Sequence, residues 1–564
     1  MPGFARSLEG HSPQLAIGLL QYPLLVRAHQ GSCPLTAIVL LILALSLLLR
    51  LLLAAELPPG FDEAYYYLYT RHPDWSYFDH PPLVAWVTGL GPLLMGQVSA
   101  FSIRLGSLLL FTGSSFLLYW TGAHLFSVRA GLISLAVANI APILLVGFGV
   151  LTLPDSPLIF FLSTTLWVAS REFFPLPSQG MQGRLGLYGA TRYQPGPKLA
   201  LMGLLVGLAC LGKYHGLALG FGLVLFCGLS PHHRCALRSG WTGLAVLLFL
   251  LALSPVLLWN AQQDWVSFRF QGGRALPQGG YQLLDLMLTA LAGILYLLPS
   301  LGIPLWQVSL AESGRILLQT IQGVRLRDED LKRLLILACG LPLVLSFTVM
   351  GGYRQILPTW PMPGFWVLTL LLGSHWQGWR QVGRWLVGSG LVVVLLLGVG
   401  LTHVRYGLLQ APGGLGLWPV ERDPSTQLIE IEQLRQSFQT NATLAAALAE
   451  ADFIFTNAYF LAGQIGMALA PLTDKPLTCL DRDLRGFAFW SKPEDGLGQD
   501  GLLITSKQFQ PPEGIPATYG DYFASLEPVA TLPLLRAGAV VQTFQVYLAR
   551  QMLKPYPRPY SRLR

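Results

Sequence analysis

The hydrophobic positions of the chain fall in long apolar runs that are separated by short polar stretches as far as about residue 402. About eleven runs approach the roughly 20 residues that an α-helix needs to cross the hydrocarbon of a bilayer. They lie at about 35 to 55, 100 to 126, 130 to 149, 155 to 171, 198 to 211, 214 to 229, 241 to 259, 282 to 308, 333 to 350, 357 to 373 and 385 to 402. The pattern predicts an all-α polytopic membrane protein with about eleven transmembrane helices.

The pattern changes at both ends of this helical region. Near the N-terminus the only apolar run is short and broken by Gln21 and Pro23, so this segment is expected to stay cytoplasmic. After His403, short segments such as DFIFT and VVQTFQVYL alternate with helical patterns, which is typical of a small α/β domain. The expected parts are a cytoplasmic segment at 1–34, a transmembrane domain at 35–402 and an α/β domain at 403–564 with a basic, proline-rich tail.

Composition and charge agree with a membrane protein. The chain is 52% hydrophobic and only 12% charged, with a mean hydropathy of +0.51, which excludes a soluble globule of this size. Its net charge of +8 does not indicate a nucleic-acid partner, because Lys and Arg are dispersed in the loops between apolar runs. With a cytoplasmic N-terminus these basic loops all fall inside. The first outer loop, 56–99, and the C-terminal domain then lie outside the plasma (inner) membrane.

The first outer loop contains a dense group of candidate functional residues within FDEAYYYLYTRHPDWSYFDHPP, residues 61–82. The candidates are Asp62, Glu63, Tyr66, Asp79 and His80. Two structural alternatives stand beside this interpretation. Asp62 follows a Pro-Pro-Gly turn and is suited to capping a helix, and aromatic residues gather at membrane interfaces in any membrane protein.

Further candidates lie on the same outer side, at helix ends or in outer turns. They are Arg104, Asp155, Lys213, Tyr214, His215, Tyr353, Arg354 and Trp360. Ionisable groups at membrane spans are costly and are by default functional hypotheses. The alternatives are snorkelling of basic side chains to the headgroups, helix capping by Asp155 and an aromatic belt that includes Trp360.

These residue types favour one reaction class. No pool of nucleotide-activated sugar exists outside a plasma membrane, so a transferase there needs a donor that arrives through the bilayer, such as a lipid-linked phosphosugar. A carboxylate can take the proton of an acceptor hydroxyl, and basic side chains can stabilise the departing lipid phosphate. No cofactor or metal is required. Clustered carboxylates can also hold a divalent cation, so that alternative stays open.

Several segments together resemble a known family: DEAYY, SYFDHPPL, FSIRL at 101–105, LTLPDSPL at 151–158, GKYH at 212–215 and LPTWPMPGF at 357–365. They are similar to bacterial members of glycosyltransferase family 39, the protein O-mannosyltransferase and aminoarabinose-transferase-like enzymes with the GT-C fold. The resemblance implies that Asp62 is the catalytic aspartate and that Arg104 and Lys213 lie near the lipid phosphate. The chain lacks the inserted β-trefoil domain of eukaryotic protein mannosyltransferases.

The hypothesis is therefore a membrane glycosyltransferase that moves a sugar from a polyprenyl-phosphate donor to an extracytoplasmic glycan, lipid or protein, with inversion at the anomeric carbon. Asp62 acts as general base. One alternative is transfer of aminoarabinose to lipid A. Another is a non-enzymatic transporter of lipid or glycan, although the sequence has no evident internal repeat of the kind that transporters carry.

Overall fold

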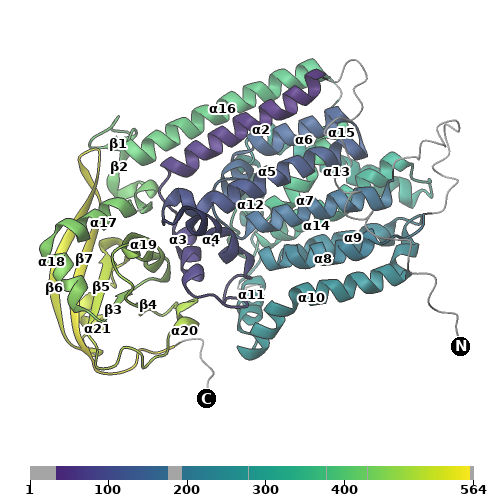
Figure 1. Cartoon of the computed structure of the whole chain (residues 1–564). Coiled ribbons are helices and arrows are strands. Elements are labelled where there is room, and N and C mark those ends of the chain that lie inside the picture. Colours follow the sequence, from purple (N-terminus) through teal and green to yellow (C-terminus); the bar gives the residue numbers. More distant parts are fainter. Residues whose placement is uncertain (1–32, 176–192, 277–278, 377, 429, 559–564) are drawn as a thin grey trace, which may run out of the picture.

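The computed structural model describes the chain except residues 1–32, 176–192, 277–278, 377, 429 and 559–564. The expected cytoplasmic segment at 1–34 and the end of the basic tail therefore lie almost wholly outside the described residues. A bundle of helices occupies most of the chain, and a smaller part built around a β-sheet lies against one end of the bundle (Figure 1).

The bundle consists of helices that follow the apolar runs of the sequence. They are α2 (Cys33–Glu56), α3 (Phe61–Arg71), α4 (Leu83–Met95), α5 (Ala100–Leu125), α6 (Val128–Ile140), α7 (Asp155–Phe173), α8 (Lys198–Gly212), α9 (Gly216–Leu229), α10 (Gly240–Gln262), α11 (Val266–Ala275), α12 (Leu283–Tyr296), α13 (Pro299–Ile321), α14 (Asp328–Met350), α15 (Met362–His375) and α16 (Trp379–Tyr406). A π-helical turn, η1 (Ile143–Phe148), and a short 3₁₀ helix, η3 (Arg234–Arg238), connect some of them.

Within the described residues, five helices are long and apolar enough to cross a membrane, or six if α12 and α13 form one bent span. The five are α2, α5, α10, α14 and α16. The chain is therefore a multi-pass membrane protein. Several further helices, among them α6, α8 and α9, are apolar but shorter. The count of about eleven spans stays a prediction.

Two runs that were expected to be single spans are broken in the structure. The run at 282–308 forms α12 and α13, which meet at an angle of 119°. Leu298 at the break has a positive φ of 73°, and Pro299 begins the next helix. The run at 130–149 divides into α6 and η1, with Pro142 directly before η1. In both places a proline removes a backbone N–H donor, so the preceding helix does not continue.

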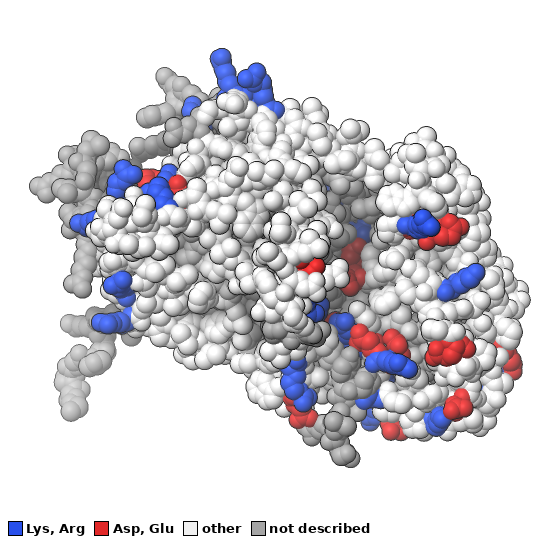
Figure 2. All heavy atoms as spheres, turned by 180° about the vertical axis from the view of Figure 1, so that it is seen from behind, with Lys and Arg blue, Asp and Glu red and all other residues white. Residues whose placement is uncertain are grey.

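The charged residues of the molecule lie mainly at its two ends (Figure 2). Seen from this side, the middle of the helical body shows almost no Lys, Arg, Asp or Glu, whereas both signs of charge cover the C-terminal part. The opposite end of the bundle shows mostly Lys and Arg. An uncharged belt between charged ends is the surface that a bilayer requires.

The C-terminal part contains a five-stranded sheet in the order β4-β3-β5-β7-β6, in which β3 pairs parallel with β4 and β5 while β7 pairs antiparallel with β5 and β6. The strands expected in DFIFT and VVQTFQVYL are present as β3 and within β7. The strands are β3 (Phe453–Thr456), β4 (Leu477–Cys479), β5 (Gly501–Ser506), β6 (Phe523–Arg536) and β7 (Ala539–Met552), and a two-stranded pair is formed by β1 (Gln410–Ala411) and β2 (Trp418–Pro419). The helices are η4 (Val420–Arg422), η5 (Pro424–Gln427), α17 (Ile431–Thr440), α18 (Ala442–Glu450), α19 (Tyr459–Leu469), α20 (Phe487–Trp490), η6 (Lys507–Phe509) and α21 (Ile515–Tyr519).

Helix α19 joins the C-terminal part to α3 of the bundle. Gly463 packs so closely on α3 that a Cβ atom there would lie 2.4 Å from the Tyr65 backbone nitrogen. The backbone N–H of Gly486 donates to the Tyr65 hydroxyl at 2.8 Å. The tyrosines of α3 and the apolar side chains of α19 and one sheet face belong to one hydrophobic core. The C-terminal part is therefore packed directly on the helix that carries Asp62.

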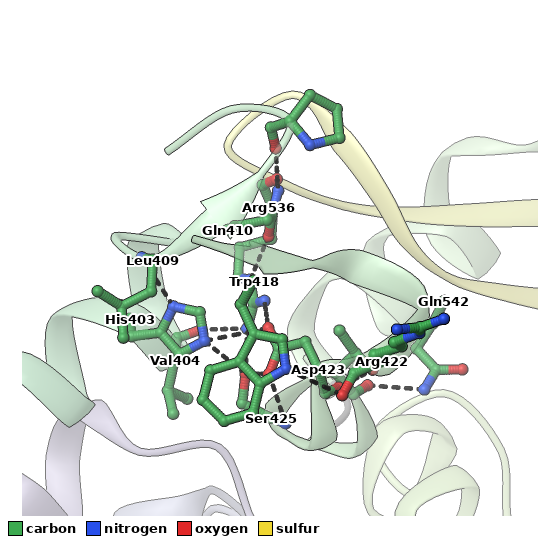
Figure 3. A network of polar contacts seen from close by, with 12 residues as sticks. His403, Val404, Leu409, Gln410, Trp418, Arg422, Asp423, Ser425, Arg536 and Gln542 are labelled. Atoms are coloured by element: carbon green, nitrogen blue, oxygen red, sulfur yellow. Dashed lines mark hydrogen bonds and ion pairs between the residues drawn. The ribbon is translucent and has the colours of Figure 1, made fainter. Parts of the chain in front are cut away.

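A buried polar network joins the sheet to the end of the last bundle helix (Figure 3). His403 of α16 accepts the Leu409 backbone N–H at its Nδ1 atom, so its Nε2 atom carries the proton toward Asp423, 3.0 Å away. Arg536, at the end of β6, donates to both Asp423 and Ser425. Each of these polar groups has a hydrogen-bond or ion-pair partner within the protein. The network therefore fixes the C-terminal part to the end of α16.

Candidate active site

Asp62 and Glu63 are neighbours on α3 with opposite surroundings. The helix begins after Gly60, whose backbone N–H donates to Glu63 Oε2 at 2.9 Å, while Glu63 Oε1 accepts the Thr152 backbone N–H at 3.0 Å. Asp62 is solvent-exposed and has no hydrogen-bond or ion-pair partner among the described residues. The alternative in which Asp62 caps the helix is wrong, because Glu63 performs the capping and leaves the Asp62 carboxylate free.

Arg104 of α5 forms a closed clamp with Glu63 beneath the start of α3. Its Nε and Nη2 atoms donate to the two Glu63 oxygens at 2.8 and 2.6 Å. The remaining N–H groups of Nη1 and Nη2 donate to the carbonyls of Ala54, Leu57 and Pro58 at 2.6 to 3.0 Å. The Arg104 side chain is fully buried. The clamp therefore fixes the end of α2 against the start of α3.

This geometry corrects two sequence-based predictions. A guanidinium has five N–H donors, and all of those of Arg104 are used within the protein. No donor is left for a lipid phosphate. Glu63 is likewise enclosed by Arg104 and two backbone N–H groups, so it does not face a substrate. The sequence could not separate these residues from Asp62 because contacts across 41 residues of chain decide the difference.

Lys213 and Asp155 form a second buried ion pair. The Lys213 ammonium lies 2.9 Å from both oxygens of Asp155, which is the first residue of α7. Asp155 makes no capping hydrogen bond, so the pairing with Lys213 replaces the capping alternative. Lys213 follows α8 in an extended conformation and lines a cavity. Unlike Arg104, it therefore presents its charge to open space.

The cavity has a volume of about 340 Å³ and a polar and an apolar part. It is lined by His80, Lys213, Tyr214, His215, Leu217, Ala218, Gln271, Arg274, Leu343, Phe347, Met350 and Trp360. Five of the predicted residues, His80, Lys213, Tyr214, His215 and Trp360, thus share one cavity although they come from three separate segments of the chain. A cationic end next to aliphatic and aromatic walls suits an amphiphilic anion.

Two polar residues of the cavity wall, Gln271 and Arg274, were not predicted. Both lie on α11, in a segment that contains none of the candidates predicted from the sequence. Gln271 Nε2 donates to the Asp79 carbonyl at 2.8 Å. The Arg274 guanidinium lies 5.0 Å from the Trp360 ring centre and has no carboxylate within 4.0 Å among the described residues. Burial and the neighbouring Arg485 and Arg354 charges lower the Arg274 pKa.

Asp79 is buried in a network between the first outer loop and the C-terminal part. The Tyr69 hydroxyl donates to Asp79 Oδ1, and Arg485 Nη1 lies 3.4 Å from Asp79 Oδ2. Burial raises the pKa of the Asp79 carboxyl, while Arg485 and the Tyr69 hydrogen bond lower it. Arg485 was not predicted, because nothing in its local sequence, LDRDLRGF, distinguishes it from other surface charges.

The remaining first-loop candidates, Tyr66 and His80, contact each other. Tyr66 is buried and lies edge-on to the His80 ring at 5.4 Å. Burial raises the Tyr66 pKa, and the negative charge of Asp62 raises it further. Burial and the charges of Lys213, Arg274 and Arg485 hold the His80 pKa well below its ordinary value. His80 is therefore a neutral imidazole that can donate or accept a hydrogen bond.

The surroundings of Asp62 shift the pKa of its carboxyl. Its side chain is accessible, yet enclosure by protein atoms raises the pKa of its carboxyl. The nearby Asp79 charge raises this pKa further, whereas Arg485 and Lys213 lower it. An accessible, unpaired carboxylate with a raised pKa is a stronger base than an ordinary aspartate and is suited to accepting a proton.

Tyr353 and Arg354 do not line the cavity. Tyr353 is 38% exposed and packs edge-on to Tyr281 at 4.8 Å. Arg354 donates to the backbone carbonyl of Arg274, so it supports the end of α11. The predicted contact of Tyr353 with substrate has no support from this position.

Metal binding was left open by the sequence. Across the part of the chain that the structure describes, no three His, Cys, Asp or Glu side chains are arranged to hold a metal ion. Asp62, Asp79 and Asp155 instead differ in their partners: the first has none within that part, and the other two pair with Arg485 and Lys213.

Comparison with known sequences identifies two partial matches. Residues 79–173 match the family model described as dolichyl-phosphate-mannose-protein mannosyltransferase. Lipid A galacturonosyltransferase RgtD of Rhizobium johnstonii is 26% identical over 221 residues, which are 37% of this chain. The match spans 40% of the length of that curated relative.

Comparison with solved structures covers nearly the whole chain. ArnT from Cupriavidus metallidurans bound to undecaprenyl phosphate has a TM-score of 0.59 at 16% identity, covering 91% of this chain and 98% of that chain. The same protein in the apo state covers the same shares with a TM-score of 0.56. This similarity shows a shared fold over most of the chain.

The family model covers the chain from Asp79, within the first outer loop, through the helices that follow as far as residue 173, and the structural match covers 91% of the chain. The chain thus shares the fold of ArnT, and its sequence matches agree with the resemblance to glycosyltransferase family 39.

Proposed function

We propose that the chain is a glycosyltransferase that moves a sugar from a polyprenyl-phosphate-linked donor to an acceptor on the extracytoplasmic side of the inner membrane. One observation carries this proposal: an unpaired carboxylate, Asp62, lies within electrostatic reach of Lys213, which lines a cavity with a cationic and an apolar part. The cationic part suits the phosphate of the donor, and the apolar part suits the first isoprene units.

Asp62, Lys213 and Arg274 have separate roles in the proposed reaction. Asp62 accepts the proton of the acceptor hydroxyl, whose oxygen attacks the anomeric carbon of the sugar. The bond from that carbon to the phosphate oxygen breaks, and its electrons leave with the lipid phosphate. Lys213 and Arg274 stabilise the charge that develops on this leaving group. Attack from the face opposite the phosphate inverts the configuration at the anomeric carbon.

Asp155 has a supporting role in this mechanism. It holds the Lys213 ammonium with two short contacts, which leaves one N–H direction of the ammonium for a phosphate oxygen. The neutral His80 imidazole and the Tyr214, His215 and Trp360 side chains form the walls around that position. Arg104 and Glu63 act by holding α3 in place and not by touching the donor.

A lipid acceptor is a specific second possibility within this reaction class. The curated relative from Rhizobium johnstonii is named a lipid A galacturonosyltransferase, and ArnT was solved with undecaprenyl phosphate. These names support lipid A as an acceptor to test first. Mass spectrometry of lipid A from a deletion strain and from wild type separates it from a glycan or protein acceptor.

The direct test is transfer by purified protein in detergent or nanodiscs. Undecaprenyl-phosphate-linked mannose, galacturonic acid and aminoarabinose are supplied separately with extracted envelope lipids and glycans. Release of undecaprenyl phosphate in step with a sugar-modified product supports the proposal. Binding without release from any donor would favour the transporter alternative.

Sidedness is tested separately in cells. A reporter that is active only in the periplasm is expected to be active after Ala411 and silent after Arg325, because the basic loops predict these two sides. The reverse result would put the cavity inside and remove the need for a lipid-linked donor.

A further inference from the structure

Arg485 is the most unusual charged residue outside the groups already assigned a task. It lies in the loop between β4 and α20 of the C-terminal part, and its φ of +46° is in the left-handed region. Residues other than glycine adopt this region at a cost in free energy, and such strain persists only where the surroundings fix it. Strained residues of this kind cluster at ligand sites.

The Arg485 guanidinium is fixed from several sides. It lies 4.8 Å from the Phe270 ring centre of α11 and 4.7 Å from the Tyr459 ring centre of α19. Its Nε atom donates to Asp483 at 3.0 Å, and its Nη1 atom lies 3.4 Å from Asp79. These contacts hold the plane of the guanidinium between the helical bundle and the C-terminal part.

One side of this guanidinium remains open. No described residue accepts a hydrogen bond from its Nη2 atom, although the Arg485 side chain is only 18% exposed. The position is also next to the cavity, because Arg485 and Arg274 lie 4.8 and 5.4 Å from the same Phe270 ring centre. Asp79, which pairs with Arg485, accepts a hydrogen bond from Gln271 of the cavity wall. The two N–H donors of Nη2 are thus held beside the cavity without a partner in the described part of the chain.

The surroundings favour a sugar as the ligand of these donors. In the proposed function Lys213 and Arg274 already serve the donor phosphate, which leaves the sugar without an assigned contact. A rigid guanidinium beside the Asp79 carboxylate and the Tyr459 ring offers donors, an acceptor and an aromatic face. Polar groups placed precisely against aromatic walls are typical of sites that orient a small polar ligand.

We propose that Arg485 binds the transferred sugar and that the C-terminal part therefore supplies one wall of the donor site. This inference rests on the proposed function and extends it to the sugar. The free Nη2 group hydrogen-bonds the ring substituents, while Asp79 and Tyr459 bound the same subsite. Two parts of the molecule that are far apart in sequence then complete one site.

The test compares the full-length wild type with the Arg485→Gly variant. Glycine adopts the left-handed region without steric strain, so the substitution relieves the backbone while it removes the guanidinium. Affinities are measured for undecaprenyl phosphate alone and for undecaprenyl phosphate that carries mannose, galacturonic acid or aminoarabinose. We expect Arg485→Gly to bind the bare lipid phosphate as wild type does and to lose about tenfold or more of the affinity for the sugar-bearing donor.

Controls separate sugar binding from a structural role. Arg482→Ala removes an exposed arginine from the same loop and is expected to leave both affinities unchanged. Arg485→Lys keeps the charge without the planar fork and is expected to restore only part of the sugar-dependent affinity. Thermal stability of Arg485→Gly is expected to fall, because the buried Asp79 loses its ion-pair partner, so the deciding quantity is the ratio of the two affinities in the folded variant.

Each other outcome overturns the proposal in a recognisable way. Equal losses for the bare lipid and the sugar donor would make Arg485 a phosphate ligand or a structural residue. No loss for either would remove it from the site. If the wild type itself binds none of these lipids, the proposed function fails, and the assignment of Arg485 fails with it.

Discussion

Two buried ion pairs lie near the start of α3, and they differ in what surrounds their charges. Arg104 and Glu63 are enclosed on all sides, and every N–H group of Arg104 has a protein acceptor. Lys213 and Asp155 are nearly as buried, yet Lys213 lines a cavity of about 340 Å³. The first pair is saturated with protein partners, and the second retains a direction in which a ligand can approach.

The comparison shows that burial and charge alone do not indicate function. Breaking a buried pair is costly because it leaves one charge without a partner, so a saturated pair is well suited to fixing backbone segments. A pair beside a cavity holds a cation in place and still offers it to an anion. The same contrast separates Glu63 from Asp62: the two carboxylates are adjacent in sequence, but the protein supplies partners only to the buried Glu63 among the described residues.

The largest effect is expected for Asp62→Asn. Asparagine has the same shape but cannot accept the proton, and loss of acid–base assistance typically lowers the rate by about 100-fold to 10,000-fold. Stability and affinity for undecaprenyl phosphate are expected to change little, because Asp62 has no partner among the described residues. The measurements are the transfer rate, lipid affinity and thermal unfolding of the purified variant.

Glu63→Gln is the matched control on the neighbouring residue. It is expected to lower thermal stability first, because an amide cannot accept from Arg104 and two backbone N–H groups with both of its polar atoms. Wild-type transfer by Asp62→Asn would make Asp62 dispensable and require another base, such as Asp79.

The next largest effect is expected on folding, for Arg104→Met. Removing one partner of a buried pair typically costs about 3–5 kcal/mol, and this change also frees three backbone carbonyls. The folded fraction in membranes and the thermal unfolding temperature are expected to fall sharply. A variant as stable as wild type that lost only lipid affinity would show that Arg104 binds the phosphate. The two ion pairs would then not differ in the way described above.

A smaller effect is expected at the Lys213–Asp155 pair. A single Lys213→Ala change would leave Asp155 buried and unpaired, so the informative variant is the double change Lys213→Gln with Asp155→Asn, which keeps a neutral pair of similar size. Loss of one charge-assisted hydrogen bond makes the binding free energy less favourable by roughly 1.5–3 kcal/mol. Affinity for undecaprenyl phosphate is therefore expected to fall about 10- to 150-fold with little change in stability.

Arg405→Gln provides a control for the loss of a positive charge, because this arginine forms a partly exposed pair with Glu430 at the end of α16. It is expected to leave lipid affinity unchanged. Undiminished affinity in the double variant would instead show that the Lys213–Asp155 pair is structural, like the Arg104 clamp.

The smallest effect concerns pH. Transfer requires ionised Asp62, so its rate falls as the pH decreases through the Asp62 pKa, which enclosure and Asp79 raise above the ordinary carboxyl value. Arg485 lowers this pKa, and removing its charge in Arg485→Gly is expected to move the acid limb of the rate profile to higher pH. The same profile measured for Arg482→Ala is expected to match wild type.

Much of this molecule follows from the sequence. The apolar runs predict the helices, because a segment that crosses a bilayer must be both hydrophobic and internally hydrogen-bonded. The alternating segments after His403 predict strands that correspond to β3, β5 and β7. Asp62, His80 and Lys213 stand out because polar groups at the ends of membrane helices are rare and costly.

The tertiary structure alone decided which polar residues are free. Arg104 and Lys213 are indistinguishable as cations at helix ends, and only packing between distant helices gives Arg104 five acceptors and Lys213 an open cavity. Arg274 and Arg485 lie in stretches of ordinary polar sequence and enter the site because α11 contacts the loop after α3 and because α19 of the C-terminal part packs on α3. Hydrogen-bond saturation depends on neighbours in space, and a sequence lists only neighbours along the chain.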